Sequence, residues 1–156
     1  MKIGIIVHSE TGNTLAVARQ LQEGLRAAGH TAETKRLKLT GKPQDRNVGI
    51  VDPPDAGAYE GLVFGAPVHG FALSKGMDTY LSQIPSLQGK TVACFVTKGL
   101  PFAGTGGNQA IARMRQVCES RGATVCATGI VIWRGQREKQ IADLVERFRR
   151  CFEGGR

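Results

Sequence analysis

The sequence predicts an α/β fold in which a five-stranded parallel sheet carries helices on both faces. Two observations predict it: short apolar runs alternate with amphipathic stretches along the 156 residues, and four of the five apolar runs are nearly continuous. A continuous apolar run is typical of a strand that is covered on both faces. Strands that alternate with helices through short connections run parallel, with right-handed crossovers between them.

Each expected strand follows from one of these runs. The strands are Lys2–Val7, Thr31–Leu37, Gly61–Ala66, Thr91–Thr97 and Thr124–Ile132. The second is more polar than the others and its apolar residues alternate, so we expect it at an edge of the sheet.

Four stretches between or after the strands repeat apolar residues at helical spacing. They span Leu15–Ala28, Met77–Ile84, Ile111–Cys118 and Ile141–Phe152. Gly29, Pro85 and Gly122 follow the first three stretches as stop signals. The connection Thr40–Tyr59 is rich in Pro, Gly and Asp, and we expect at most one short helix in it, near Ala56–Glu60.

Size and composition indicate a single domain, residues 1–156, without membrane insertion. The chain is 41% hydrophobic, and no apolar run approaches the roughly 18 residues that cross a bilayer. The start, MKIGIIVHSE, becomes polar quickly and has no small-residue cleavage site after it, unlike a signal peptide. We therefore expect the chain to open on the first strand of a cytoplasmic protein.

The chain is basic, with 21 Lys and Arg against 13 Asp and Glu and a net charge of +8. A basic balance can indicate nucleic acid or an acidic partner. Only six Phe, two Tyr and one Trp are present, and no nucleic-acid motif occurs. We therefore expect a solvated basic face and no nucleic-acid partner.

The four cysteines, Cys94, Cys118, Cys126 and Cys151, are scattered along the chain. They form no C-x-x-C pair and no zinc-type spacing, so no metal site is predicted. We interpret them as small buried hydrophobic residues in a reducing compartment.

Three segments rich in glycine follow the first, third and fourth strands. They are HSETGNT (8–14), GAPVHGFALSKG (65–76) and TKGLPFAGTGGNQ (97–109). Ligands of open parallel sheets bind beyond the carboxyl ends of the strands, near the point where the strand order reverses. These three segments are therefore the expected walls of a binding site.

The first segment has the residue types of an anion cradle. It leads into a helix, so its backbone N–H groups and the helix dipole would converge on a negative group. Its hydroxyl and amide side chains add donors and its glycine permits close approach, but it contains no Lys or Arg. A monophosphate therefore fits better than a triphosphate, which calls for the lysine and Mg²⁺ of a G-K-[ST] loop. The alternative is that these residues only cap the helix.

Other loop chemistries lack their residues here. A phosphatase loop needs a cysteine near its start and an arginine near its end, and neither is present. A phospho-acceptor receiver domain needs aspartates at the ends of the first and third strands, where this chain has His8 and Ala66–Pro67. The Rossmann dinucleotide fingerprint is also missing.

The motifs SETGNT, GAPVHG and TKGLPFAGTGG, in this order after these strands, resemble those of the flavodoxin family. The resemblance covers essentially the whole chain, and the lack of a long insertion in the fifth strand is similar to the short-chain branch. It implies a flavodoxin-like three-layer sandwich with strand order 2-1-3-4-5. It also implies that the chain binds FMN non-covalently.

The resemblance implies a set of cofactor-binding residues. The FMN phosphate would be held by Ser9, Glu10 (through its backbone), Thr11, Gly12, Asn13 and Thr14. One wall of the ring site would be Ala66, Pro67, Val68, His69, Gly70 and Phe71, and the other Thr97, Lys98, Gly99, Leu100, Pro101, Phe102 and Gly104. Gly70 lies where the family often has a glycine whose carbonyl turns towards the flavin N5, a peptide flip that only glycine makes cheaply.

The ring segments depart from the family in charge and in one aromatic position. The segments 65–76 and 97–109 contain no Asp or Glu but carry Lys75 and Lys98, and His69 stands where Trp is often found. A cation roughly 6 Å from the anionic reduced flavin is worth about 3 kcal/mol at an effective dielectric of about 20, before screening. We therefore expect a less negative potential than in acid-lined relatives. The alternatives are that Lys98 points to solvent and that His69 only packs at the edge.

Three functions remain open at this point. The first is an FMN-binding electron-transfer protein that carries electrons between redox partners and needs no catalytic acid or base. Its basic surface indicates either that the partner is acidic or that the reactant is small, so that electrostatic steering matters little. The second is an NAD(P)H-dependent FMN or quinone reductase, in which Lys98 stabilises the reduced flavin and His69 assists proton delivery. The third is an anion-binding module without flavin. The sequence leaves open whether the chain is a monomer or a dimer.

Overall fold

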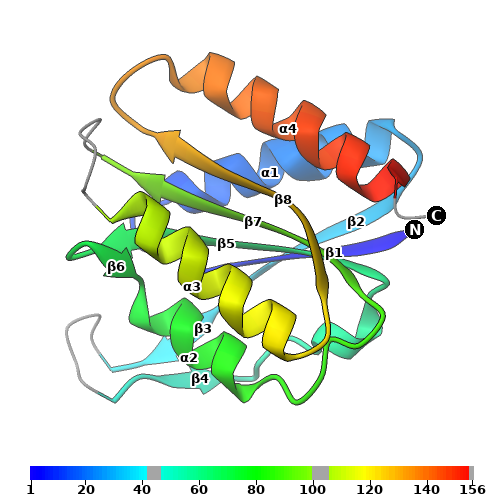
Figure 1. Ribbon diagram of the computed structural model, residues 1–156. Coiled ribbons are helices and arrows are strands. Elements are labelled where there is room, and N and C mark those ends of the chain that lie inside the picture. The colour runs from blue at the N-terminus through cyan, green and yellow to red at the C-terminus, as the bar shows by residue number, and fades with distance from the viewer. Residues whose placement is uncertain (42–46, 100–105, 155–156) are drawn as a thin grey trace.

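A parallel β-sheet runs through the middle of the molecule (Figure 1). The computed structural model describes residues 1–41, 47–99 and 106–154. The sheet strands are β1 (Lys2–Val7), β2 (Thr31–Arg36), β5 (Gly61–His69), β7 (Thr91–Lys98) and β8 (Thr124–Ile132). Their order is β2-β1-β5-β7-β8, with parallel pairing throughout. The predicted order 2-1-3-4-5 is confirmed, and so is the edge position of the second strand.

Within the described residues, four α-helices cover the sheet, two on each face (Figure 1). Helices α1 (Asn13–Ala27) and α4 (Arg137–Gly154) pack together on one face, and α2 (Lys75–Gln83) and α3 (Gly107–Ser120) on the other. The predicted three layers are therefore confirmed. In the described part of the chain, no helix combines the length and the apolar character needed to span a lipid bilayer.

The continuous apolar runs are explained by a core on each side of the sheet. In β1, Ile3, Ile5 and Val7 pack under α1 and α4, whereas Ile6 packs under α2 and α3. Successive side chains of a strand point to opposite faces, so a strand that is covered on both faces must be apolar at nearly every position.

The Thr40–Tyr59 connection contains more regular structure than we expected. Strands β3 (Lys38–Thr40) and β4 (Gly49–Val51) form a separate antiparallel pair. The short helix expected near Ala56–Glu60 is present as a 3₁₀ turn, Ala56–Ala58. Strands of three residues are too short to carry a recognisable alternation.

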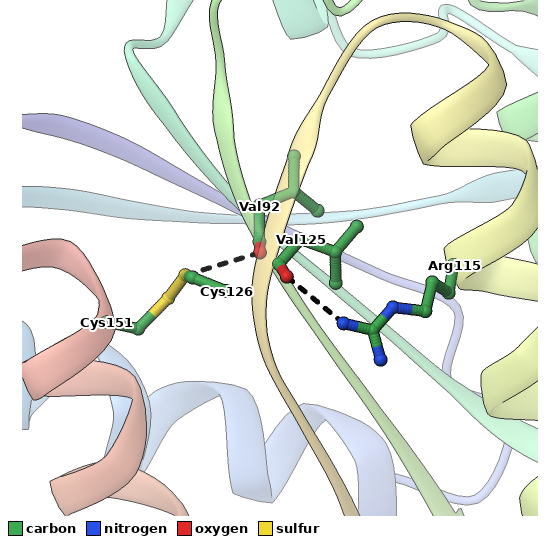
Figure 2. The surroundings of a disulfide bond; sticks show 5 residues. All are labelled: Val92, Arg115, Val125, Cys126 and Cys151. Carbon is green, nitrogen blue, oxygen red and sulfur yellow. Dashed lines mark hydrogen bonds between the residues drawn. A yellow bond between two sulfur atoms is a disulfide. The ribbon is translucent and has the colours of Figure 1, made fainter.

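The prediction of four buried thiols is wrong for two cysteines. Cys94 and Cys118 are buried and free, as expected. Cys126 and Cys151 form a disulfide, with Cα atoms 5.6 Å apart (Figure 2). The two residues are 25 positions apart in sequence, and the packing of α4 beside β8 brings them together. Sequence spacing carries no sign of that contact.

Close packing explains why position 4, inside β1, is a glycine. A Cβ atom on Gly4 would lie 2.5–2.7 Å from ring atoms of Tyr59. The ring cannot move away easily, because it is buried and its hydroxyl donates a hydrogen bond of 2.9 Å to Glu33. Glycine in a strand often marks such a close approach.

We predict that Gly4→Ala lowers the free energy of unfolding by about 1–3 kcal/mol, because overpacking forces a buried ring to shift. Urea unfolding measures this change. Gly99→Ala is the matched control, since a Cβ atom there has no neighbour within 4 Å among the described residues. Equal effects of the two substitutions would contradict the packing explanation.

Candidate functional site

The register of the central strands brings the three glycine-rich segments to one edge of the sheet. Val7 at the end of β1 is level with Gly65 of β5, and Pro67 of β5 is level with Thr97 of β7. The backbone N–H of His8 extends the pairing by donating to the carbonyl oxygen of Gly65 at 3.0 Å. The segments that leave these strands are therefore neighbours, as predicted.

A cavity of about 190 Å³ lies where the segments meet. Its lining comes from all three of them: Glu10, Thr11, Asn13, Thr14, Pro67, His69, Thr97 and Lys98. All eight are among the residues predicted to bind the cofactor. Lys98 therefore faces the cavity rather than pointing only to solvent.

The first segment forms a tight turn at the start of α1. Gly12 has φ of 95°, in the left-handed region that favours glycine, and its carbonyl oxygen accepts the N–H of Ala16 at 2.9 Å. Ser9 accepts the N–H of Leu15 through its hydroxyl oxygen at 3.2 Å. Ser9 thus has the capping role that we kept as an alternative, while Thr11, Asn13 and Thr14 face the cavity.

A buried hydrogen bond connects the first segment to the third. The hydroxyl oxygens of Thr14 and Thr97 are 2.8 Å apart, and both residues are buried. A buried hydroxyl left without its partner costs about 1–3 kcal/mol. This pair therefore fixes the first turn of α1 against the end of β7.

Arg36 supplies a cation that sequence reasoning missed. It ends β2, and its guanidinium donates from Nε and Nη2 to the carbonyl oxygen of Ser9, at 3.0 Å from Nε. The first segment has no basic residue of its own, yet this charge lies against it. The signal was available: Arg36 is level with Val7 in the parallel pairing, so it lies at the same sheet edge as the segment.

A carboxylate lies between two histidines at the cavity. Oε1 of Glu10 is 3.5 Å from Nε2 of His8 and 3.6 Å from Nε2 of His69. The two rings are 5.8 Å apart and nearly perpendicular. We expected Glu10 to act only through its backbone, but its side chain lines the cavity and brings a carboxylate to the otherwise acid-free ring segments.

His8 is held in its neutral form. Burial, followed by the charges of His69 and Arg36, lowers its pKa to about 4. Its Nδ1 is 2.7 Å from the hydroxyl oxygen of Ser74, which accepts the N–H of Met77 at the start of α2. The tautomer that suits this network has Ser74 donating to Nδ1 and the Nε2–H directed at Glu10.

The tip of the second segment is a two-residue hairpin turn. Gly70 and Phe71 both have positive φ, 54° and 70°, and join β5 to the antiparallel β6 (Ala72–Leu73). Positive φ at both positions is typical of a type I′ turn and is uncommon for a residue such as Phe. Phe71 is 66% exposed, and its backbone lies so near Gly106 that a Cβ atom there would come within 2.3–2.5 Å.

The other predicted residues that the structure describes do not line the cavity. The side chain of Ala66 is fully buried in the core beneath α2 and α3, and Val68 packs against the same core. Gly99 is the last described residue of its segment. Leu100, Pro101, Phe102 and Gly104 lie outside the described residues.

Comparison with known proteins gives two named classes. No family model matches the chain. A protein named NAD(P)H dehydrogenase (quinone), from Archaeoglobus fulgidus, is 26% identical over 123 residues, 66% of this chain and 64% of that protein. A flavodoxin from Clostridium saccharobutylicum is 31% identical over 99 residues, 62% of this chain and 56% of its own length. The chain thus spans less than two thirds of the length of each of these two relatives.

A third relative matches over more of its length. The flavodoxin of Megasphaera elsdenii is 29% identical over 132 residues, 83% of this chain and 85% of that protein. The solution structure of two-electron reduced Megasphaera elsdenii flavodoxin superposes with a TM-score of 0.70 at 25% identity, covering 95% of this chain and 98% of that one. The similarity therefore includes the whole sheet and its helices.

We predict that His8 makes the free energy of unfolding fall as the pH is lowered. The unfolded state binds a proton near pH 6.5, whereas native His8 stays neutral down to about pH 4. The contribution of neutral His8 to the free energy of unfolding is therefore complete above pH 6.5. About 3 kcal/mol of this free energy is lost as the pH falls from 6.5 towards 4. Urea unfolding of the native chain and His8→Gln across this range measures the difference. Parallel profiles for the native chain and His8→Gln would contradict the assignment.

Proposed function

We propose that the chain is a flavodoxin-family protein that binds FMN non-covalently and carries electrons between redox partners, because it is similar to flavodoxins in sequence and fold. The observation that carries the proposal is the cavity whose lining comes from all three segments at the carboxyl edge of the sheet. The net charge of +8 favours acidic partners, because complementary charge steers encounter.

The cavity lining fits the phosphate of FMN. Thr11, Asn13 and Thr14 offer neutral donors at the start of α1, where backbone N–H groups and the helix dipole favour an anion. Arg36 adds a positive charge next to the turn. The carboxylate of Glu10 would repel a phosphate, and its contacts with His8 and His69 direct it towards the histidines.

The ring of FMN would lie beyond the phosphate, against the second and third segments. His69 and Pro67 face the cavity from one side and Lys98 from the other, with the exposed Phe71 at the hairpin tip. Bound FMN would supply one- and two-electron transfer, and the chain's residues position it and set the charge around it. With FMN bound, Lys98 would stabilise negative charge on the ring, and the carboxylate of Glu10 would oppose this effect.

A reductase on the same fold is the second candidate, and one observation favours it. His69 and Glu10 lie in contact beside the cavity, with Nε2 3.6 Å from Oε1. Such a pair can hold and deliver a proton during two-electron chemistry. The Archaeoglobus fulgidus relative bears the name of such an enzyme.

Anaerobic reduction of the purified protein separates the candidates. A carrier takes up electrons in two separate one-electron stages and is not reduced by NADH or NADPH alone. A reductase is bleached directly by one of the nicotinamides in a single two-electron stage. A preparation that shows no flavin absorbance, even after addition of excess FMN, would overturn both proposals.

We predict that Lys98→Gln makes the potential of the fully reduced flavin more negative by tens of millivolts, because it removes a cation that faces the cavity. Spectroelectrochemical titration measures the shift. Lys139→Gln removes an equal charge from an exposed position of α4 and should leave the potential nearly unchanged. An equal shift in both variants would show that net charge, not position, sets the potential.

A further inference from the structure

The disulfide lies on the open edge of the sheet, at an irregularity in strand pairing. Val92 pairs with Val125 and Ala93 with Ala127, so Cys126 has no partner on β7. The extra residue is a β-bulge, a feature that re-aims a side chain and is common at sheet edges and beside active sites. Cys126 is exposed and Cys151 is half-buried. Figure 2 shows Cys126 directed towards α4, away from α3.

A cavity of about 470 Å³ lies beside this disulfide. Both cysteines line it, together with three arginines, Arg115 of α3 and Arg147 and Arg150 of α4. Arg147 lies one helical turn before Cys151 on the same side of α4. The cavity therefore combines a sulfur–sulfur bond with guanidinium groups that can receive an anion.

The charge of the cavity is positive. Arg115 is paired with Glu119 at 2.8 Å and Arg150 with Glu146 at 3.1 Å. Glu146 is shared with Arg149, so its charge is divided between two arginines. Within residues 1–41, 47–99 and 106–154, Arg147 makes no ion pair, and its Nη1 donates to the carbonyl oxygen of Thr128 at 2.8 Å.

The strand edge at this cavity is blocked for another strand. Arg147 covers the carbonyl of Thr128, and Arg115 donates to the carbonyl of Val125 at 3.3 Å (Figure 2). A strand edge whose acceptors are covered by charged side chains resists β-addition. The occupant that fits is therefore a small anion rather than an extended peptide.

We propose that Cys126–Cys151 is a redox-active disulfide that is reduced by low-molecular-weight thiols carrying a carboxylate, which bind through Arg147 and Arg150. This site is separate from the proposed FMN cavity, because the two linings share no residue. Exposed disulfides are the ones that exchange readily with thiols, and nearby arginines stabilise the thiolates that form.

The exchange takes two steps. The incoming thiolate attacks Sγ of the more exposed Cys126, the bond between the two protein sulfurs breaks, and Cys151 leaves as a thiolate that takes a proton from water. A second thiolate attacks the sulfur of the bound thiol, which releases a small disulfide and Cys126 as a thiolate. In total, two thiols lose two electrons and the protein disulfide gains them.

The reduced state has a hydrogen-bond acceptor already in place. Sγ of Cys126 is 3.5 Å from the carbonyl oxygen of Val92 (Figure 2). A sulfur in a disulfide has no hydrogen to donate, whereas the thiol of Cys126 can donate to this oxygen. Opening the bond therefore creates a contact that partly offsets the loss of the crosslink.

The test uses three small thiols that differ mainly in charge: 3-mercaptopropionate, 2-mercaptoethanol and cysteamine. The full chain is reduced in the dark, and thiols that appear at Cys126 and Cys151 are alkylated and counted by mass spectrometry. Each rate is expressed per thiolate and divided by the rate at which the same thiol reduces a small uncharged disulfide. We expect the anionic thiol to be about tenfold faster than the cationic one.

Two variants locate the effect. Arg147→Gln, which keeps a donor for Thr128, should bring the ratio of anionic to cationic rates several-fold nearer to one. Arg19→Gln, at an exposed position of α1, should leave the ratio unchanged. If Arg147→Gln does not fold, the ratio in the native chain must fall as salt is raised. Three results would each overturn the proposal. The first is four free thiols in the air-oxidised chain, and the second is equal rates for all three small thiols. The third is a ratio of anionic to cationic rates that changes neither with Arg147→Gln nor with salt.

Discussion

The in-register parallel pairing of β1, β5 and β7 is the constraint on which the candidate site depends. It places Val7 level with Gly65 and Pro67 level with Thr97. A slip of one residue would move every side chain of a strand to the opposite face, where it would meet the packing of the wrong core. The two-sided core therefore fixes the register, and the register fixes which loops become neighbours. The buried contact between Thr14 and Thr97 is possible only in this alignment.

Charge at the site is distributed over elements that are distant in sequence. Arg36 comes from an edge strand, Lys98 from the end of β7, and Glu10 from the turn before α1. Glu10 is drawn to the histidines, which leaves the neutral donors of the turn facing the cavity. Burial keeps His8 uncharged, so it can orient Glu10 through its Nε2–H without adding a second cation. The result is a cavity that can accept an anion although it contains a carboxylate.

The five strands of the parallel sheet and the four long helices were predictable because each of them carries a local signal. The runs Lys2–Val7 and Thr124–Ile132 have the predicted bounds. For Lys2–Val7 the reason is two-sided burial, which demands nearly unbroken apolar residues. Eight of the cavity residues were also predictable, because the turns that follow the strands share one edge. The cation of Arg36, the side-chain role of Glu10 and the disulfide of Cys126 were not recognised. Each depends on a contact between elements, and only the first leaves a trace in strand register.

Binding of FMN compared with riboflavin tests whether the first turn holds a phosphate, because the two flavins differ only in that group. Flavin fluorescence quenching on titration into the apoprotein measures both dissociation constants. The account predicts that FMN binds at least about 100-fold more tightly, a difference of about 2.7 kcal/mol. Equal affinities for FMN and riboflavin would contradict it, because the turn before α1 would then contribute nothing to binding.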